Sequence, residues 1–258
     1  MLRVIPVLPV LLLVACASPT HGPRTRPLTT ADALDTLECT PLLLTVSARS
    51  TSNARVVGAG SGVLVGPRLI ATASHVVPPG ASLVTAFVDT GTRGEAVAID
   101  HVIRGEESHF WDGDWAIIVL KTPFLSLQAR AAPRLAEPDS PVPTPGTEVL
   151  VAGFPFAQAV GDPLERRPVL LASRVIARPS GVPESPSIFF ARNTDGDPGR
   201  PGASGSPVFV QAGAESLVLV GLYCGTADRA LLGIQLERSL VIHRLPTAAI
   251  RSALEALD

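Results

Sequence analysis

Positions 202–210 read GASGSPVFV, a serine flanked by glycines in a short segment directly before an apolar, strand-like run. Glycine adopts backbone conformations that other residues rarely adopt, so neighbouring N–H groups can converge on one point beside Ser204. Such converging amides can stabilise a developing oxyanion. The segment therefore indicates a serine nucleophile, although a Gly/Ser/Pro cluster is also typical of a hairpin turn.

A histidine and an aspartate lie at the ends of two further strand-like runs. Positions 69–77 read LIATASHVV and contain His75, and positions 112–120 read DGDWAIIVL and contain Asp114. A carboxylate at the mouth of a buried strand can fix the tautomer of an imidazole and stabilise the imidazolium, as the third member of a Ser-His-Asp triad does. Asp112 is the rival for this role. No comparable setting surrounds the other histidines, which are His21, His101, His109 and His243.

Taken together, in the order His75, Asp114, Ser204, these segments resemble the trypsin-like serine peptidase superfamily. The resemblance runs from about residue 42 to the end of the chain. The short linkers resemble the bacterial branch with the HtrA/Deg proteases and the glutamyl endopeptidases, without a PDZ domain. The resemblance to the superfamily implies an all-β, chymotrypsin-like fold: two six-stranded antiparallel β-barrels with a C-terminal helix and the site in the cleft between them.

The resemblance also implies a role for each matching residue. Ser204 attacks the scissile carbonyl, His75 takes its proton, and Asp114 accepts a hydrogen bond from His75. The backbone N–H groups of Gly202 and Ser204 form the oxyanion hole. The substrate is expected to bind along a strand that contributes Gly221, Tyr223, Cys224 and Gly225. Glutamyl endopeptidases carry a histidine at the position of Tyr223, so a preference for glutamate is not expected.

The domain organisation follows from short β-like runs divided by a Pro-rich stretch. Residues 41–137 are predicted to form the first barrel, and residues 138–258 to hold the linker, the second barrel and the helix. Four prolines within residues 137–146 exclude a helix or a central strand there. Helical spacing predicts the C-terminal helix over 247–257, with Thr247 as its N-cap. Strands are predicted at 42–46, 63–65, 69–73, 82–88, 96–102, 115–120, 148–152, 168–177, 187–191, 207–210, 217–223 and 231–236.

The N-terminal residues indicate export. Arg3 is followed by an apolar stretch that ends in LVAC at 13–16, which resembles a lipoprotein signal peptide (1–15) with Cys16 as the lipidated residue. An ordinary secretory signal is the alternative. Residues 16–40 are predicted to be a polar tether. The expected location is the bacterial cell envelope, at the outer rather than the inner membrane, with the lipid as membrane anchor.

Composition and the remaining cysteines narrow the function further. A net charge of −2 and 4% aromatic residues argue against nucleic acid binding. Scattered histidines imply no metal, and no cofactor is expected. Cys39 and Cys224 could form a disulfide in an oxidising compartment or could remain free.

The sequence predicts an exported, monomeric serine endopeptidase that hydrolyses proteins or peptides through an acyl-enzyme. The alternative is a catalytically silent trypsin-like domain that acts as an exported protein-binding module. An α/β-hydrolase would use Ser204, Asp228 and His243 in that order, but its G-x-S-x-G elbow requires glycine where this chain has Ser206.

Overall fold

A computed structural model describes residues 41–49, 55–88, 94–106, 112–127, 132–154, 169–180, 182, 184–194, 203–212, 216–227 and 239–257. The predicted signal peptide and tether, with Cys16 and Cys39, lie outside these residues. Gly202 and the strand predicted at 231–236 also lie outside them. The helix that the structure describes is too short to cross a membrane.

The first six strands close into an antiparallel barrel. Its strands are β1 (Pro41–Arg49), β2 (Arg55–Gly66), β3 (Leu69–Thr72), β4 (Ala81–Val88), β5 (Glu95–Arg104) and β6 (Ala116–Leu120). They pair in the order β1-β2-β3-β6-β5-β4, and β1 pairs with β4 to close the ring. Apolar side chains fill its interior, among them Leu42, Leu44, Val84 and Ile118.

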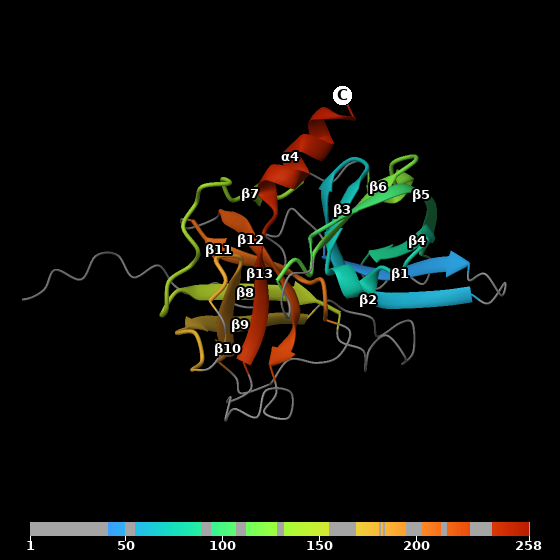
Figure 1. The fold of residues 1–258 in the computed structure, drawn as a ribbon. Helices are drawn as coiled ribbons and strands as arrows, with labels where there is room; N and C mark the ends of the chain where they lie inside the picture. The colour runs from blue at the N-terminus through green and yellow to red at the C-terminus, as the bar shows by residue number, and fades with distance from the viewer. Residues whose placement is uncertain are drawn as a thin grey trace, which may run out of the picture.

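The second barrel contains six further strands. They are β8 (Glu148–Gly153), β9 (Val169–Ile176), β10 (Ile188–Asn193), β11 (Pro207–Gln211), β12 (Leu217–Ala227) and β13 (Ser239–Arg244). The order is β11-β8-β9-β10-β13-β12, and the pairing of β11 with β12 closes it. The short strand β7 (Arg134–Leu135) adds to β12 in parallel. The predicted pair of six-stranded antiparallel barrels is confirmed (Figure 1).

The two barrels pack against each other through a shared apolar cluster. Val63, Leu69 and Ile117 of the first barrel lie in one buried cluster with Phe209 and Leu222 of the second. The helix α4 (Thr247–Glu255) adds Ile250 and Ala253 to this cluster. Burial of apolar surface is the main favourable term in such packing. The barrels therefore form one body, with α4 beside the junction (Figure 1).

Three details of the prediction are wrong or incomplete. Strand β13 was not predicted, because residues 239–243 are buried on both faces of the strand and show no polar–apolar alternation. Helix α4 is capped by Pro246 without a side-chain hydrogen bond, and Thr247 is its first helical residue. Strand β7 belongs to the second sheet although it precedes the predicted division after residue 137. The stretch 137–146 has neither helix nor strand, as predicted.

Candidate active site

His75 and Asp114 lie side by side at one end of the first barrel. His75 lies in the 3₁₀ turn η1 (Ser74–Val76) after β3, and Asp114 lies two residues before β6. The His75 Nδ1 atom is 2.8 Å from Asp114 Oδ2, and the His75 backbone N–H donates to Asp114 Oδ1 at 3.1 Å. The aspartate side chain is 9% exposed and the imidazole 49%. With its proton on Nδ1, the imidazole keeps Nε2 as a proton acceptor.

The Asp114 carboxylate is ionised at neutral pH. Burial raises the pKa of Asp114, but the hydrogen bonds and charge of His75 lower it, and the net direction is below the ordinary value of 3.8. An ionised, buried carboxylate is suited to orient an imidazole and to stabilise its protonated form.

This pKa shift predicts a pH dependence of stability. Because the folded pKa of Asp114 is depressed, its contribution is present above the unfolded value and is lost as pH falls through the folded value. Urea denaturation should show Asp114→Asn to be less stable by about 1–3 kcal/mol at pH 7. The deficit should shrink as the pH is lowered below 4. An equal loss of unfolding free energy at pH 7 and at low pH would contradict the lowered pKa of Asp114.

Arg104, at the end of β5, holds the turn that carries His75. Its Nη1 donates to the Ser74 carbonyl at 3.0 Å and to the Ser74 hydroxyl at 2.9 Å. Its Nη2 donates to the carbonyls of Val77 at 2.7 Å and Pro78 at 3.4 Å. One planar guanidinium thus ties down the residues on both sides of His75.

Replacement of Arg104 is expected to loosen this turn. Arg104→Ala should reduce the rate of reaction at Ser204 about tenfold to a hundredfold, because the loss of charged hydrogen bonds allows His75 to move. The rate of Arg104→Lys should lie between those of the wild type and Arg104→Ala, since an ammonium group cannot reproduce the planar fork of hydrogen bonds that the guanidinium makes. The matched control is Arg174→Ala, which removes an exposed ion pair with Glu148 on the second barrel. Equal rates for Arg104→Ala and this control would refute the role of Arg104 in holding the His75 turn.

Ser204 lies in the tight turn before β11. Gly205 follows it at φ 85°, and a Cβ at this position would lie 2.1 Å from the Ser61 carbonyl oxygen, so only glycine fits. The Gly205 N–H donates to the Tyr223 carbonyl at 2.7 Å, and the Ser206 N–H to the Ala203 carbonyl at 2.9 Å. The turn is therefore closed by its own backbone and is fixed to the second barrel directly after the serine.

The same turn is fixed to the first barrel. The Ser61 N–H of β2 donates to the Ser204 carbonyl at 2.7 Å, and the Ser61 hydroxyl accepts from the Phe154 N–H at 2.9 Å. A Cβ on Gly60 would lie 2.8 Å from the Ser204 carbonyl oxygen and 2.6 Å from Val76, the neighbour of His75. Ser204 and the His75 turn thus flank the same point of β2.

Cys224 on β12 links Ser204 to Asp114. The Ser204 hydroxyl donates to the Cys224 carbonyl at 3.4 Å, and the Cys224 thiol donates to the Asp114 carbonyl at 3.5 Å. The structure thereby brings the three predicted residues to one side of the barrel junction. Within the described residues, the Ser204 hydroxyl has its hydrogen bond with Cys224 and not with His75. This bond is long, and rotation about χ1 moves a serine hydroxyl between staggered positions.

The predicted oxyanion hole is described only in part. Gly202 lies outside the described residues, and the Ser204 N–H has no acceptor among those that the structure describes. The next two amides, of Gly205 and Ser206, are both taken up by backbone carbonyls. Of the two predicted donors, the structure thus supplies the Ser204 amide.

The predicted substrate-binding residues differ in exposure. Gly221, Tyr223 and Cys224 are buried in β12, and Gly225 is partly exposed. The Tyr223 hydroxyl pairs with the Thr226 hydroxyl at 2.7 Å, and its ring lies in the core of the second barrel. Cys224 is a free, buried thiol, and Cys39, the disulfide partner that the sequence left open, lies outside the described residues. Burial raises the pKa of the Cys224 thiol, which keeps it neutral.

The rival aspartate has a different partner. Asp112 accepts a hydrogen bond from the Ser187 hydroxyl of the second barrel, whereas Asp114 is the carboxylate on His75. No local sequence pattern pointed to Arg104 or to His243, whose buried ring contacts the backbone beside Asp114. Their partners are remote in the sequence, so only the fold brings them together.

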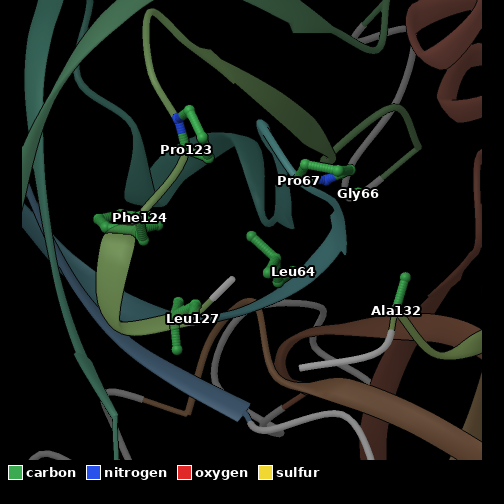
Figure 2. A pocket seen from close by; sticks show the side chains of 7 residues that line it. All are labelled: Leu64, Gly66, Pro67, Pro123, Phe124, Leu127 and Ala132. Carbon is green, nitrogen blue, oxygen red and sulfur yellow. The ribbon is translucent and has the colours of Figure 1, made fainter. Parts of the chain in front are cut away.

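An apolar pocket of about 500 Å³ lies elsewhere on the first barrel. It is lined by Leu64, Gly66, Pro67, Pro123, Phe124, Leu127 and Ala132 (Figure 2). No described residue of the predicted active site lines it, and it offers no acid, base or nucleophile. Among the described residues, no cluster of three or more ligating side chains could hold a metal ion.

Two packed six-stranded barrels, with a His–Asp pair on the first and a glycine-flanked serine on the second, define a trypsin-like peptidase domain. The chain belongs to this family, because the family model for the trypsin-like peptidase domain matches residues 60–222, more than half of the sequence. No curated protein matches the sequence. The comparisons give the superfamily and do not single out its bacterial branch.

A solved structure shows the same fold at low sequence identity. The scabies mite inactivated protease paralogue S-I1 aligns with a TM-score of 0.60 and 17% identity, over 83% of this chain and 94% of that one. At this identity the match supports the fold alone.

Proposed function

We propose that this protein is a serine endopeptidase in which Ser204 is the nucleophile, His75 the general base and Asp114 the residue that orients His75. The observation that carries the proposal is the pair of hydrogen bonds from His75 to the buried Asp114 carboxylate. These contacts fix the imidazole with Nε2 available to take a proton. Membership of the trypsin-like peptidase family supports a protein or peptide as substrate.

The proposed reaction has two halves. The Ser204 oxygen attacks the scissile carbonyl carbon while His75 Nε2 takes the hydroxyl proton, and the protonated His75 then donates this proton to the leaving amine. The resulting acyl-enzyme is cleaved by a water molecule that His75 deprotonates. The backbone amides of Gly202 and Ser204 stabilise the oxyanion in both halves.

A catalytically silent binding domain is the second candidate. The observation in its favour is that the Ser204 hydroxyl donates to the Cys224 carbonyl, so the described residues contain no Ser204–His75 hydrogen bond. Against it, histidine, aspartate and serine are all present and gathered at one junction. A silent domain would bind peptides at this junction without turnover.

Turnover of a peptide library separates the two candidates. The full chain is incubated with a library of diverse sequences, and new termini are identified by mass spectrometry, with Ser204→Ala as the control. We expect cleavage by the wild type alone, blocked by a fluorophosphonate. Binding of library peptides by a folded wild type without new termini would support the silent domain.

We further propose that the protein is exported as a monomeric lipoprotein anchored through Cys16, with the outer membrane as its destination. The support for export and for the anchor is the sequence of residues 1–16. The outer membrane is favoured because Ala17 and Ser18, which follow the cysteine, carry no acidic side chain. Expression in a bacterial host with a radiolabelled fatty acid tests the anchor. Wild type should incorporate label and Cys16→Ser should not; a labelled Cys16→Ser variant or an unlabelled, exported wild type would reject it.

A further inference from the structure

A buried histidine outside the proposed triad contacts the loop that carries Asp114. His243 lies on β13 of the second barrel and is 4% exposed. Its Nδ1 lies 2.5 Å from the Arg244 carbonyl oxygen, and its Nε2 accepts a hydrogen bond from the Gly113 N–H at 3.3 Å. A carbonyl can only accept and an N–H can only donate. The ring is therefore neutral, with its single proton on Nδ1.

The partner of His243 sits at a critical point of the first barrel. Gly113 has φ 82° and directly precedes Asp114. Its carbonyl accepts from the Trp115 N–H at 2.7 Å, which closes a tight turn around the aspartate. A shift of the Gly113 amide would move the Asp114 backbone with it.

The second barrel holds this loop at other points as well. Ser187, before β10, donates to the Asp112 carboxylate, and the Cys224 thiol donates to the Asp114 carbonyl. Two of these contacts, those of His243 and Cys224, come from buried side chains on strands of the second barrel. The position of Asp114 in the first barrel is thereby coupled to the barrel that carries Ser204.

We propose that His243 is a positioning residue: as a neutral, Nδ1-protonated acceptor for the Gly113 N–H, it holds Asp114 in line with His75 when the two barrels are docked. This inference rests on the proposed peptidase function. His243 acts through the Gly113 backbone and touches neither the substrate nor Ser204 in this role.

The hydrogen bond between His243 and the Gly113 N–H is expected to be sensitive to acid. The charged and titratable groups around His243 are Asp112, Asp114, Cys224 and Arg244. Burial lowers the pKa of His243 and outweighs the opposing effects of the Arg244 carbonyl and the two aspartates. Protonation would place an N–H at Nε2 against the Gly113 N–H. The contact is thus complete above the ordinary value of 6.5 and is lost as pH falls through the lower, folded value.

Two variants of the full chain test the role. In His243→Gln the amide oxygen can replace Nε2 as an acceptor and cannot be protonated near neutral pH, whereas His243→Leu has no acceptor. Fluorophosphonate labelling at pH 8 should be about tenfold or more slower in His243→Leu, through the rate of inactivation and not through probe affinity. His243→Gln should remain within about threefold of wild type.

The pH profile provides a readout that a merely structural role would not change. On acidification, wild-type labelling should fall more steeply than that of His243→Gln, because the wild type loses the contact of His243 with the Gly113 N–H and the variant keeps its acceptor. Identical profiles for these two proteins would overturn the proposal, even if His243→Leu fails to fold. Equal labelling by folded His243→Leu and wild type would also overturn it.

The tautomer can be measured without activity. Nitrogen NMR of the wild type with ¹⁵N-labelled histidine should show a buried ring with a protonated Nδ1 and an unprotonated Nε2 at neutral pH, absent in His243→Gln. The opposite tautomer or a charged ring would refute the inference. Failure of wild type to react with the probe at any pH would instead reject the proposed peptidase function.

Discussion

Replacement of Ser204 by alanine is expected to abolish both fluorophosphonate labelling and peptide hydrolysis. Loss of the nucleophile from a triad lowers turnover by about 10⁶-fold, because the remaining groups have no oxygen to acylate. Stability should be nearly unchanged, since among the described residues the hydrogen bond of the Ser204 hydroxyl is a long one, at 3.4 Å, to the Cys224 carbonyl. Labelling in gel and thermal melting measure the two quantities on the same sample.

The control for this variant is Ser252→Ala. Ser252 is exposed on α4, outside the turn that carries Ser204, and removal of its hydroxyl should leave labelling and melting unchanged. Equal labelling of Ser204→Ala and Ser252→Ala would show that the probe reacts at another residue. Unfolding of Ser204→Ala would show that the hydroxyl has a structural role.

His75→Ala is expected to have the second large effect. Without His75 no base takes the hydroxyl proton, and in a triad this loss costs about as much as loss of the serine itself. Labelling should therefore be lost from a protein that still folds, because the imidazole is about half exposed. A time course of labelling over several hours measures the residual rate.

The chain supplies a matched control for the histidine. His101 also pairs with a neighbouring aspartate, Asp100, with 2.9 Å between Nδ1 and Oδ2, and both side chains are exposed. His101→Ala also removes a His–Asp pair. Among the described residues, this pair makes no hydrogen bond to the turn that carries Ser204. It should label like wild type. If His101→Ala and His75→Ala behaved alike, the distinction between the two pairs would be wrong.

The sequence predicted the architecture and the three central residues because these depend on local patterns. Apolar runs of strand length predict strands, and Asp114 is distinguished by its position before a fully buried one, β6. The resemblance to a known superfamily then supplied the closure of the barrels and the roles. The structure adds the hydrogen bonds that distinguish Asp114 from Asp112.

The supporting residues could not be predicted because their contacts cross the fold. His243 and Gly113 are separated by 130 positions, and Arg104 reaches 30 positions back to Ser74. Neither residue has a local motif. The strand of His243 was missed too, since its burial on both faces removes the alternation by which a half-buried strand is recognised.

Peptide mapping after fluorophosphonate treatment tests the central claim most directly. The folded wild-type chain is labelled at pH 8 and digested, and the modified residue is identified by tandem mass spectrometry. We predict a single adduct on the Ser204 oxygen, absent from His75→Ala and present in His101→Ala. An adduct on another residue, or an unmodified Ser204 in folded wild type, would contradict the assignment of Ser204 as an activated nucleophile.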